Sequence, residues 1–216
     1  MKKIISLFQR NYDGDKLVRN EVVPGAGWVN AGEGVATRKF DGSCCLVHGG
    51  KLFKRYEVVM RRPMAPAGVI AWEPERPLPT GFEPATEVDP TTRKQQGWVP
   101  VSDSDPADRW HREAWANQNF KTPEGGLVWL ADGTYELLGP KVQGNPEREF
   151  VEREVGPGRH LLVLHGCHIL GDCPRDFAGL RAFLETAGIE GVVWWRDLKD
   201  PDCDKVKIKR RDFFKR

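Results

Sequence analysis

The chain has 216 residues, of which 39% are hydrophobic, enough to form a core in one domain or in two small ones. Its 33 basic residues nearly balance 31 acidic residues, and the net charge of +2 excludes a protein that binds nucleic acid through its overall charge. No apolar run approaches the roughly 20 residues of a membrane helix, and the apolar patch near the N-terminus ends too early for a signal sequence. The five cysteines lack CxxC or zinc-finger spacing, so we expect a cytoplasmic protein with reduced thiols and no membrane partner.

Short apolar runs separated by glycine and charged residues predict antiparallel strands from Gly34 to Met60. The following segment, about 62–108, carries most of the prolines and predicts a loop-rich insertion that packs on the rest of the chain through its aromatic residues. A first helix is expected from about Pro106 to Asn119, with Asp105 as its N-cap.

Strand patterns return in the second half of the chain, at Leu127–Leu138, Leu161–Leu170, Gly191–Trp195 and Val206–Ile208. A second helix is expected from about Pro174 to Ala187, with Gly188 as its stop signal. Few of these strands are followed by a helix, which argues against a doubly wound parallel sheet. We therefore predict an α+β protein with antiparallel sheets flanked by helices, organised as a single domain over residues 1–216.

The stretch Lys39-Phe40-Asp41-Gly42 joins a glycine-rich segment to the strand pattern that begins near Cys44. A lysine amine can act as a nucleophile when burial or nearby cations lower its pKa. An Asp-Gly pair can equally close a hairpin and leave Lys39 in solvent. The motif alone is compatible with both interpretations.

Three further stretches place charged residues on predicted strands. Glu190 precedes a buried strand, where its carboxylate could hold Mg²⁺ or could simply lie in a turn. The stretch Lys205–Lys209 has lysine at every second position, so its lysines share one face, which suits an anion or protects an exposed edge strand. Glu136 lies near the end of an otherwise apolar strand and is uninformative by itself.

Together and in this order, the four stretches resemble motifs I, III, IV and V of the covalent nucleotidyltransferases, which comprise ATP-dependent DNA ligases, RNA ligases and mRNA capping guanylyltransferases. The resemblance spans Thr37 to Phe213. It is greatest to the ATP-dependent 5'-to-3' RNA ligases, on the stretches Lys39–Cys45, Lys54–Glu57, Gly81–Phe82, Gly97–Val101 and Gly139–Lys141. It implies a nucleotidyltransferase (ATP-grasp-like) domain, and because the sequence ends soon after motif V we expect no C-terminal OB-fold.

The resemblance implies an RNA ligase in which Lys39 attacks the α-phosphate of ATP and becomes lysyl-AMP. The AMP then passes to the 5'-phosphate of an RNA, and the 3'-hydroxyl of another end displaces it. Lys207 and Lys209 would contact the α-phosphate as further catalytic residues. Glu190 and Glu136 would bind the Mg²⁺ or Mn²⁺ cofactor.

The resemblance also implies contacts to ATP and RNA. Arg55, or alternatively Lys54, would hold the ribose or a phosphate of ATP. The residue that stacks on adenine is open between Leu164, His165 and an aromatic residue elsewhere. The full ATP-binding set is Thr37, Arg38, Lys39, Lys54, Arg55, Glu136, Glu190, Lys207 and Lys209. The residues expected to follow the RNA backbone are Arg210, Arg211, Lys215 and Arg216.

Two other functions are compatible with the same motifs within the superfamily. One is a minimal ATP-dependent DNA nick ligase, and the other is a capping guanylyltransferase, both disfavoured by the expected lack of an OB-fold. A third interpretation is a non-catalytic nucleic-acid-binding relative that keeps the fold. Such a protein would acquire no covalent label from ATP.

Overall fold

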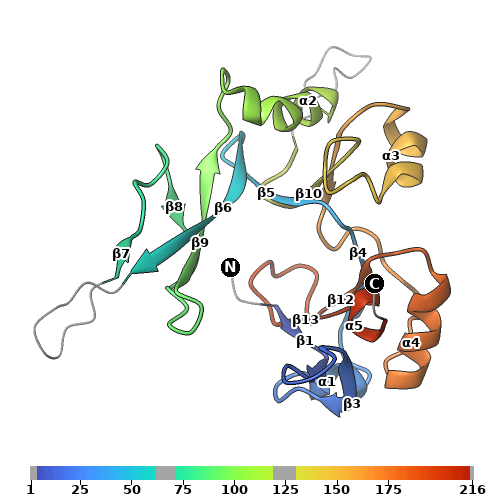
Figure 1. The fold of residues 1–216 in the computed structure, drawn as a ribbon. Coiled ribbons are helices and arrows are strands. Elements are labelled where there is room, and N and C mark those ends of the chain that lie inside the picture. The colour runs from blue at the N-terminus through green and yellow to red at the C-terminus, as the bar shows by residue number, and fades with distance from the viewer. Residues whose placement is uncertain (1–3, 62–71, 119–129, 215–216) are drawn as a thin grey trace, which may run out of the picture. The chain divides into compact units, whose positions relative to one another are not determined.

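The computed structural model describes residues 4–61, 72–118 and 130–214 (Figure 1). The chain is a mixed α/β protein with several antiparallel sheets and few helices, which confirms the sequence prediction at this level. It divides into two compact units. The central unit comprises Gly42–Val163, and the terminal unit comprises Lys2–Asp41 together with Leu164–Arg216. No helix in the described ranges is both long and apolar enough to cross a membrane.

The terminal unit is built on a four-stranded sheet in the order β1-β13-β12-β4. The strands are β1 (Ile5–Ser6), β13 (Lys205–Lys209), β12 (Gly191–Trp195) and β4 (Val35–Lys39). β1 pairs with β13 in parallel, and the other neighbours are antiparallel. A separate hairpin and three helices complete the unit: β2 (Phe8–Arg10), β3 (Val18–Val22), α1 (Gly27–Asn30), α4 (Phe177–Thr186) and α5 (Arg210–Phe213).

One face of this sheet forms the core of the terminal unit. Because side chains alternate along a strand, every second residue points to that face. Val192, Trp194 and Ile208 are fully buried there, and they belong to one cluster with Leu180 and Leu184 of α4. The opposite face carries the intervening residues of β4, β12 and β13, which include the lysines singled out by the sequence.

The helix expected from Pro174 begins later, at Phe177. Asp176 is its N-cap, and the Asp176 carboxylate accepts a hydrogen bond of 2.9 Å from the backbone N–H of Gly179. The cap therefore fixes the first turn three residues beyond the proline. The helix ends at Thr186, and Gly188 follows with φ of +63°, as its role of stop signal predicts.

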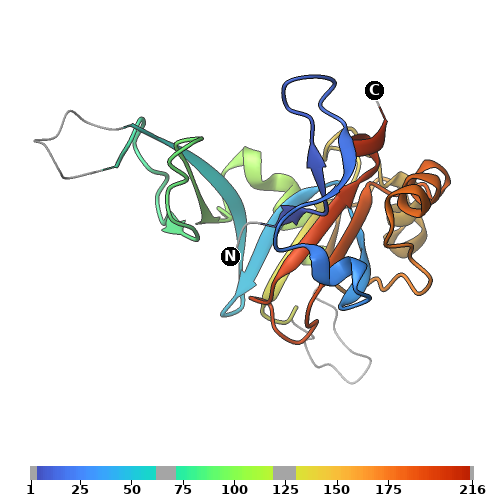
Figure 2. The ribbon, with the colours of Figure 1, turned by 90° about the horizontal axis from the view of Figure 1, so that it is seen from below.

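The central unit contains a second antiparallel sheet in the order β11-β10-β5-β6-β9-β8, with β7 paired to β6. Its strands are β5 (Ser43–His48), β6 (Lys51–Arg61), β7 (Glu73–Pro74), β8 (Glu83–Pro84), β9 (Lys94–Pro100), β10 (Gly133–Leu138) and β11 (Leu161–Leu164). β6 extends beyond β5 and forms an arm with β7, β8 and β9, as Figures 1 and 2 show.

The predicted insertion is more regular than the sequence suggested. Residues 62–71 lie outside the described part of the chain, but β9 pairs with β6 over its whole length, from Lys94 to Pro100. The sequence did not predict this strand, whereas most of the other described residues of the segment lie in loops, as expected. β9 has few apolar residues at its start, so its strand character depends on the long partner strand. Trp98 is buried, as expected for a large aromatic residue.

The other predicted elements differ at their ends. The first helix is confirmed as a 3₁₀ turn, Pro106–Asp108, continued by α2 (Arg109–Gln118), with Asp105 capping the N–H of Ala107 at 2.9 Å; Asn119 lies outside the described residues. Of the expected strand 127–138, residues 127–129 also fall outside them. β11 ends at Leu164, six residues earlier than expected, and Gly166 follows with φ of +83°. An additional helix, α3 (Arg148–Val155), was not expected.

Candidate functional site

Two lysines of the terminal unit converge on one carboxylate. Gly191 of β12 pairs with Lys39 of β4 on one side and with Lys209 of β13 on the other, so both lysines leave the same face of the sheet. The Nζ of Lys39 lies 2.5 Å from Oε2 of Glu190, and the Nζ of Lys209 lies 2.8 Å from Oε1. The Lys39 side chain is 21% exposed, so Lys39 is not the solvated turn residue of the alternative interpretation.

A second row of residues lies beside the first. Val193 of β12 pairs with Thr37 of β4 and with Lys207 of β13. Thr37 is 1% exposed, and its hydroxyl donates a 3.0 Å hydrogen bond to the carbonyl of Val193. The structure therefore brings Lys207 next to the lysines of the first row, on the same face.

The second row continues past β4 to a residue that the sequence did not identify. Ile169 pairs with Thr37 through an isolated antiparallel bridge. The flanking hydrogen bonds run from Arg38 N to His168 O and from Leu170 N to Ala36 O, both at 2.8 Å, so Ile169 and Thr37 form a non-hydrogen-bonded pair whose side chains are close. Ile169 is 60% exposed, so its aliphatic side chain is open to a ligand on this face. The row thus runs from an exposed apolar end at Ile169 to a cationic end at Lys207.

The charges of the cluster are unbalanced. Burial by itself raises the pKa of Glu190, but Lys39 and Lys209 outweigh it and hold that pKa below its ordinary value. Burial, together with the charges of Lys209 and Lys39, lowers the pKa of Lys207 to about 8. Burial and the charge of Glu190 raise the pKa of Asp41. Three amines face the two carboxylates of Glu190 and Asp41, and the resulting net positive charge suits an anion such as phosphate.

Arg38 has its side chain on the other face from Lys39, because adjacent residues of a strand point in opposite directions. Its guanidinium carbon lies 4.6 Å from the centroid of the Phe40 ring, and that ring contacts His168 edge-on. The structure does not bring the Arg38 side chain into the lysine cluster. The backbone of Arg38 takes part in the row through its hydrogen bond to His168 O, beside Ile169.

Glu136 and Arg55 lie on one face of the central sheet. Tyr135, Cys45 and Lys54 are paired across β10, β5 and β6, so they point to the same face, and the adjacent residues Glu136 and Arg55 point to the other. Glu136 is 8% exposed. Because Glu136 and Arg55 share a face, both side chains can contact the same ligand there.

Glu136 also connects to the motif that contains Lys39. Its Oε1 accepts a 3.0 Å hydrogen bond from the backbone N–H of Gly42. A Cβ atom at Gly42 would lie 2.3 Å from the carbonyl oxygen of Leu137, so only glycine allows this approach of the chain to β10. The glycine of the Lys-x-Asp-Gly motif therefore has a packing role.

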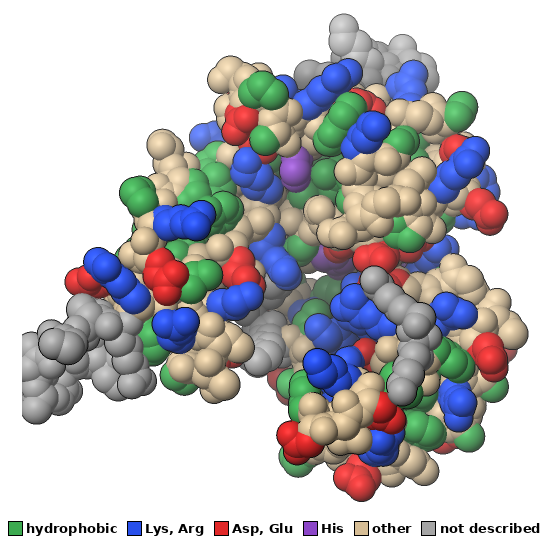
Figure 3. Space-filling model, viewed as in Figure 1, with side chains coloured by type: hydrophobic (Ala, Val, Ile, Leu, Met, Phe, Trp, Pro, Cys, Tyr) green, Lys and Arg blue, Asp and Glu red, His purple; other side chains and the backbone are tan. Residues whose placement is uncertain are grey.

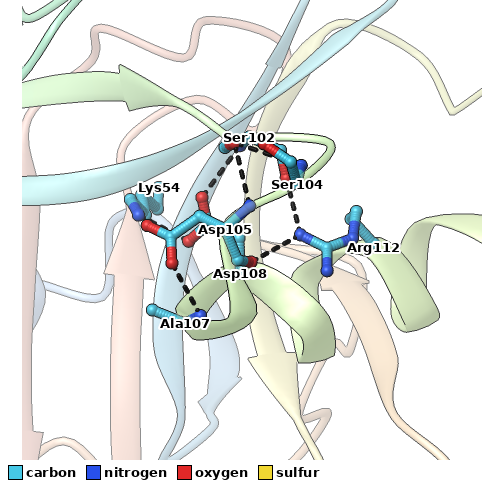
Figure 4. Close-up of polar contacts among 7 residues, drawn as sticks. All are labelled: Lys54, Ser102, Ser104, Asp105, Ala107, Asp108 and Arg112. Atoms are coloured by element: carbon cyan, nitrogen blue, oxygen red, sulfur yellow. Dashed lines mark hydrogen bonds and ion pairs between the residues drawn. The ribbon is translucent and has the colours of Figure 1, made fainter.

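Lys54 points to the opposite face of the central sheet and is held there by an ion pair. Figure 4 shows it beside the loop that leads into α2. The Nζ of Lys54 lies 2.5 Å from Asp108, which is 1% exposed and also accepts a 2.8 Å hydrogen bond from Ser102 N. These residues line a hollow of about 220 Å³ together with Tyr56 and Pro100. Of the two candidates for the ATP contact, Arg55 is therefore the one on the face of Glu136.

The remaining predicted residues concern RNA and metal. Arg210 and Arg211 are exposed in α5, directly after β13, whereas Lys215 and Arg216 lie outside the described residues.

The residues predicted to bind the metal are carboxylates, whose oxygens suit Mg²⁺ or Mn²⁺. Each oxygen of Glu190 forms an ion pair with a lysine, so a metal ion bound to Glu190 would displace the amine of Lys39 or of Lys209. Glu136 uses Oε1 for the hydrogen bond from Gly42 N.

A scan against protein-family models finds no family that matches the chain, and a search of the curated proteins finds no similar protein.

Proposed function

We propose that the chain is an ATP-dependent RNA ligase that forms lysyl-AMP on Lys39, with residues 1–216 acting as one nucleotidyltransferase domain. The observation that carries the proposal is the convergence of Lys39 and Lys209 on Glu190, with Lys207 in the adjacent row on the same face. A nucleophilic lysine surrounded by further cations is the arrangement that an attack on a phosphate requires.

In the first step the neutral amine of Lys39 attacks the α-phosphorus of ATP. A nitrogen–phosphorus bond forms, the bond from that phosphorus to the bridging oxygen breaks, and pyrophosphate leaves. Glu190, already within hydrogen-bond distance of the Lys39 amine, is positioned to accept the proton that the amine releases. Lys207 and Lys209 stabilise the negative charge on the phosphoryl oxygens.

In the second step an oxygen of an RNA 5'-phosphate attacks the lysyl-AMP phosphorus and Lys39 leaves. In the third step a 3'-hydroxyl attacks that 5'-phosphate, forms the phosphodiester and expels AMP. Mg²⁺ or Mn²⁺, when bound through Glu190 or Glu136, neutralises phosphate charge. Arg55 holds the ribose or a phosphate through its several N–H donors.

The apolar end of the second row is where the base of the nucleotide lies in this proposal. Ile169 lies level with Thr37, so it is offset from Lys39 by about 7 Å along the strand and by one strand spacing across the sheet. A nucleotide with its α-phosphate at Lys39 can therefore place its base near Ile169. Ile169→Asn is expected to raise KM for ATP about tenfold, the effect of losing about 1.4 kcal/mol of apolar contact, with little change in kcat. The control is Leu78→Asn, the same kind of change at an exposed residue of the central unit. An unchanged KM in the Ile169 variant would contradict this placement.

The pKa of Lys207, about 8, predicts a pH dependence of ATP binding. Below pH 8 the amine is charged and attracts the α-phosphate, and above pH 8 it loses that charge. KM for ATP is therefore expected to rise about tenfold between roughly pH 7.5 and 9.5. In Lys207→Arg the rise should disappear, because a guanidinium stays charged throughout this range. The labelling rate, measured against ATP concentration at each pH, gives the half-saturating ATP concentration for both proteins. Parallel pH profiles for the two proteins would refute the role of Lys207.

The proposal is tested by incubating the protein with α-labelled ATP or GTP and Mg²⁺, followed by a denaturing gel. A sealing assay on 5'-phosphorylated RNA and on nicked DNA runs beside it. Label from ATP with RNA sealing supports the RNA ligase. Label from GTP would indicate a capping enzyme, and sealing of nicked DNA alone would indicate a DNA ligase. A protein without label from either nucleotide would be a non-catalytic nucleic-acid-binding relative.

A further inference from the structure

Two arginines from different helices of the terminal unit pack on one aromatic ring. The guanidinium carbons of Arg181 in α4 and Arg210 in α5 each lie 5.6 Å from the centroid of the Phe214 ring. Both arginines are exposed. In the part of the chain that the structure describes, neither has a carboxylate within ion-pair distance.

The ring between these arginines is held by the core of the unit. Phe214 follows Phe213, which is 5% exposed and packs on Phe177 with ring centroids 5.2 Å apart. Asp212 fixes the start of α5 by accepting a 2.9 Å hydrogen bond from Lys209 N, and it forms an ion pair with Arg10. The segment that carries Arg210 and Phe214 is therefore anchored before any ligand arrives.

The two guanidinium groups on Phe214 bring two positive charges to one ring without a carboxylate between them among the described residues. Basic and acidic side chains are interspersed over the surface seen in Figure 3, as a net charge of +2 leads one to expect. Like charges brought onto one ring repel each other, and an anion relieves that repulsion. The planar fork of arginine donors matches phosphate oxygens, so phosphate is the anion that this geometry fits best.

The pair also lies next to the candidate site. The backbone N–H of Arg210 donates a 2.7 Å hydrogen bond to the carbonyl of Glu190, the residue that holds Lys39 and Lys209. Arg210 itself follows directly on Lys209. Arg210 is therefore adjacent to the lysine cluster along the chain, and Arg181, on the helix that packs against the other face of the sheet, meets Arg210 at the Phe214 ring.

We propose that Arg181, Arg210 and Phe214 form a clamp for phosphates of the RNA strand whose 5'-phosphate enters the site. The identity of the strand depends on the proposed function, whereas phosphate binding by the clamp does not. The contacts are to the backbone, so binding is independent of sequence and weakens with salt. The clamp therefore adds Arg181 and Phe214 to Arg210, which the sequence analysis had already assigned to the RNA backbone.

The test is the double variant Arg181→Gln, Arg210→Gln, with fluorescence anisotropy on a 5'-phosphorylated single-stranded RNA at several salt concentrations. At low salt Kd is expected to rise at least about tenfold. The slope of log affinity against log salt should fall by about 1.4, since each lost phosphate contact on a single strand removes about 0.7. The matched control is Arg148→Gln, Arg153→Gln on α3, which removes the same charge from another exposed helix and should leave both quantities unchanged. Equal affinities and slopes for the two double variants would overturn the clamp.

Labelling with ATP separates this inference from the proposed function. The clamp variant should acquire AMP at the wild-type rate and fail only in transfer to RNA. If labelling falls as far as RNA binding does, the arginines serve the phosphates of ATP and the proposal is wrong. If the wild-type protein acquires no label at all, the ligase proposal fails, and anisotropy still decides whether the clamp binds a phosphate backbone.

Discussion

Replacing Lys39 by arginine is expected to abolish the covalent labelling of the protein by ATP, by a factor of at least about 10³. Arginine keeps the positive charge and can keep the ion pair with Glu190, so the electrostatics of the cluster change little. A guanidinium does not lose its proton in a protein and therefore cannot act as the nucleophile. The measurement is the single-turnover rate of AMP incorporation on a denaturing gel. Lys39→Ala should give the same loss.

The matched control for this substitution is Lys199→Arg, which makes the same change at an exposed lysine of the terminal unit. It should label at the wild-type rate. Mass spectrometry of the labelled wild-type protein should locate AMP on Lys39. Label that persists in Lys39→Arg on another lysine would show that the nucleophile has been assigned to the wrong residue.

Gly191→Ala is expected to destabilise the terminal unit and to reduce labelling together. A Cβ atom at this position would lie 2.2 Å from the carbonyl oxygen of Ile208, so β12 and β13 must move apart. Such overpacking costs about 1 to 3 kcal/mol of unfolding free energy, or a fall in Tm of about 3 to 10 °C for a chain of this size. Because Lys39 and Lys209 flank Gly191, the same movement separates them from Glu190.

Gly171→Ala is the control for this prediction. No atom lies within 4 Å of the Cβ that it adds, and its backbone needs no positive φ. Thermal unfolding followed by circular dichroism, with the labelling rate measured well below Tm, compares the two variants. A Gly191→Ala protein that melts and labels like Gly171→Ala would show that the close approach of the strands is not required.

The sequence predicted the cationic part of the candidate site through motif order. Lys39 and Glu190 are 151 positions apart, and no periodicity relates residues so distant in the chain. Their joint role followed from the resemblance, and the geometry adds a physical reason, because β12 pairs with both strands that carry the lysines. The strand Gly191–Trp195 was predicted to the residue, since a continuous apolar run bounded by charge is a strong local signal.

The apolar end of the site could not be predicted in this way. Ile169 reaches its row through a single bridge to Thr37, and a pattern within one segment does not reveal the strand with which it pairs. For the same reason, the sequence could not decide between Lys54 and Arg55 as the residue that contacts ATP. They are adjacent in the sequence, and only the registers of β6 and β10 against β5 show which of them shares a face with Glu136.

The missed helix α3 has a different explanation. Only Phe150 and Val151 of its eight residues are buried, so it lacks the apolar stripe by which an amphipathic helix is recognised. Its position depends on packing within the central unit rather than on local pattern. Charged residues fill the other positions except Val155, and the sequence there resembles a solvated loop.

The second row, which runs from Ile169 to Lys207, is held by many backbone hydrogen bonds at its Lys207 end and by few at its Ile169 end. This difference predicts different rates of hydrogen exchange. β12 and β13 are joined along five paired residues, whereas the segment of Ile169 is joined to β4 by two hydrogen bonds around one pair. The amides of Arg38 and Leu170 should therefore exchange with solvent sooner than those within β12, because opening them breaks less structure. In the proposed ligase, the end at Ile169 would then adjust to the base, while the end at Lys207 would keep a fixed geometry for the phosphate.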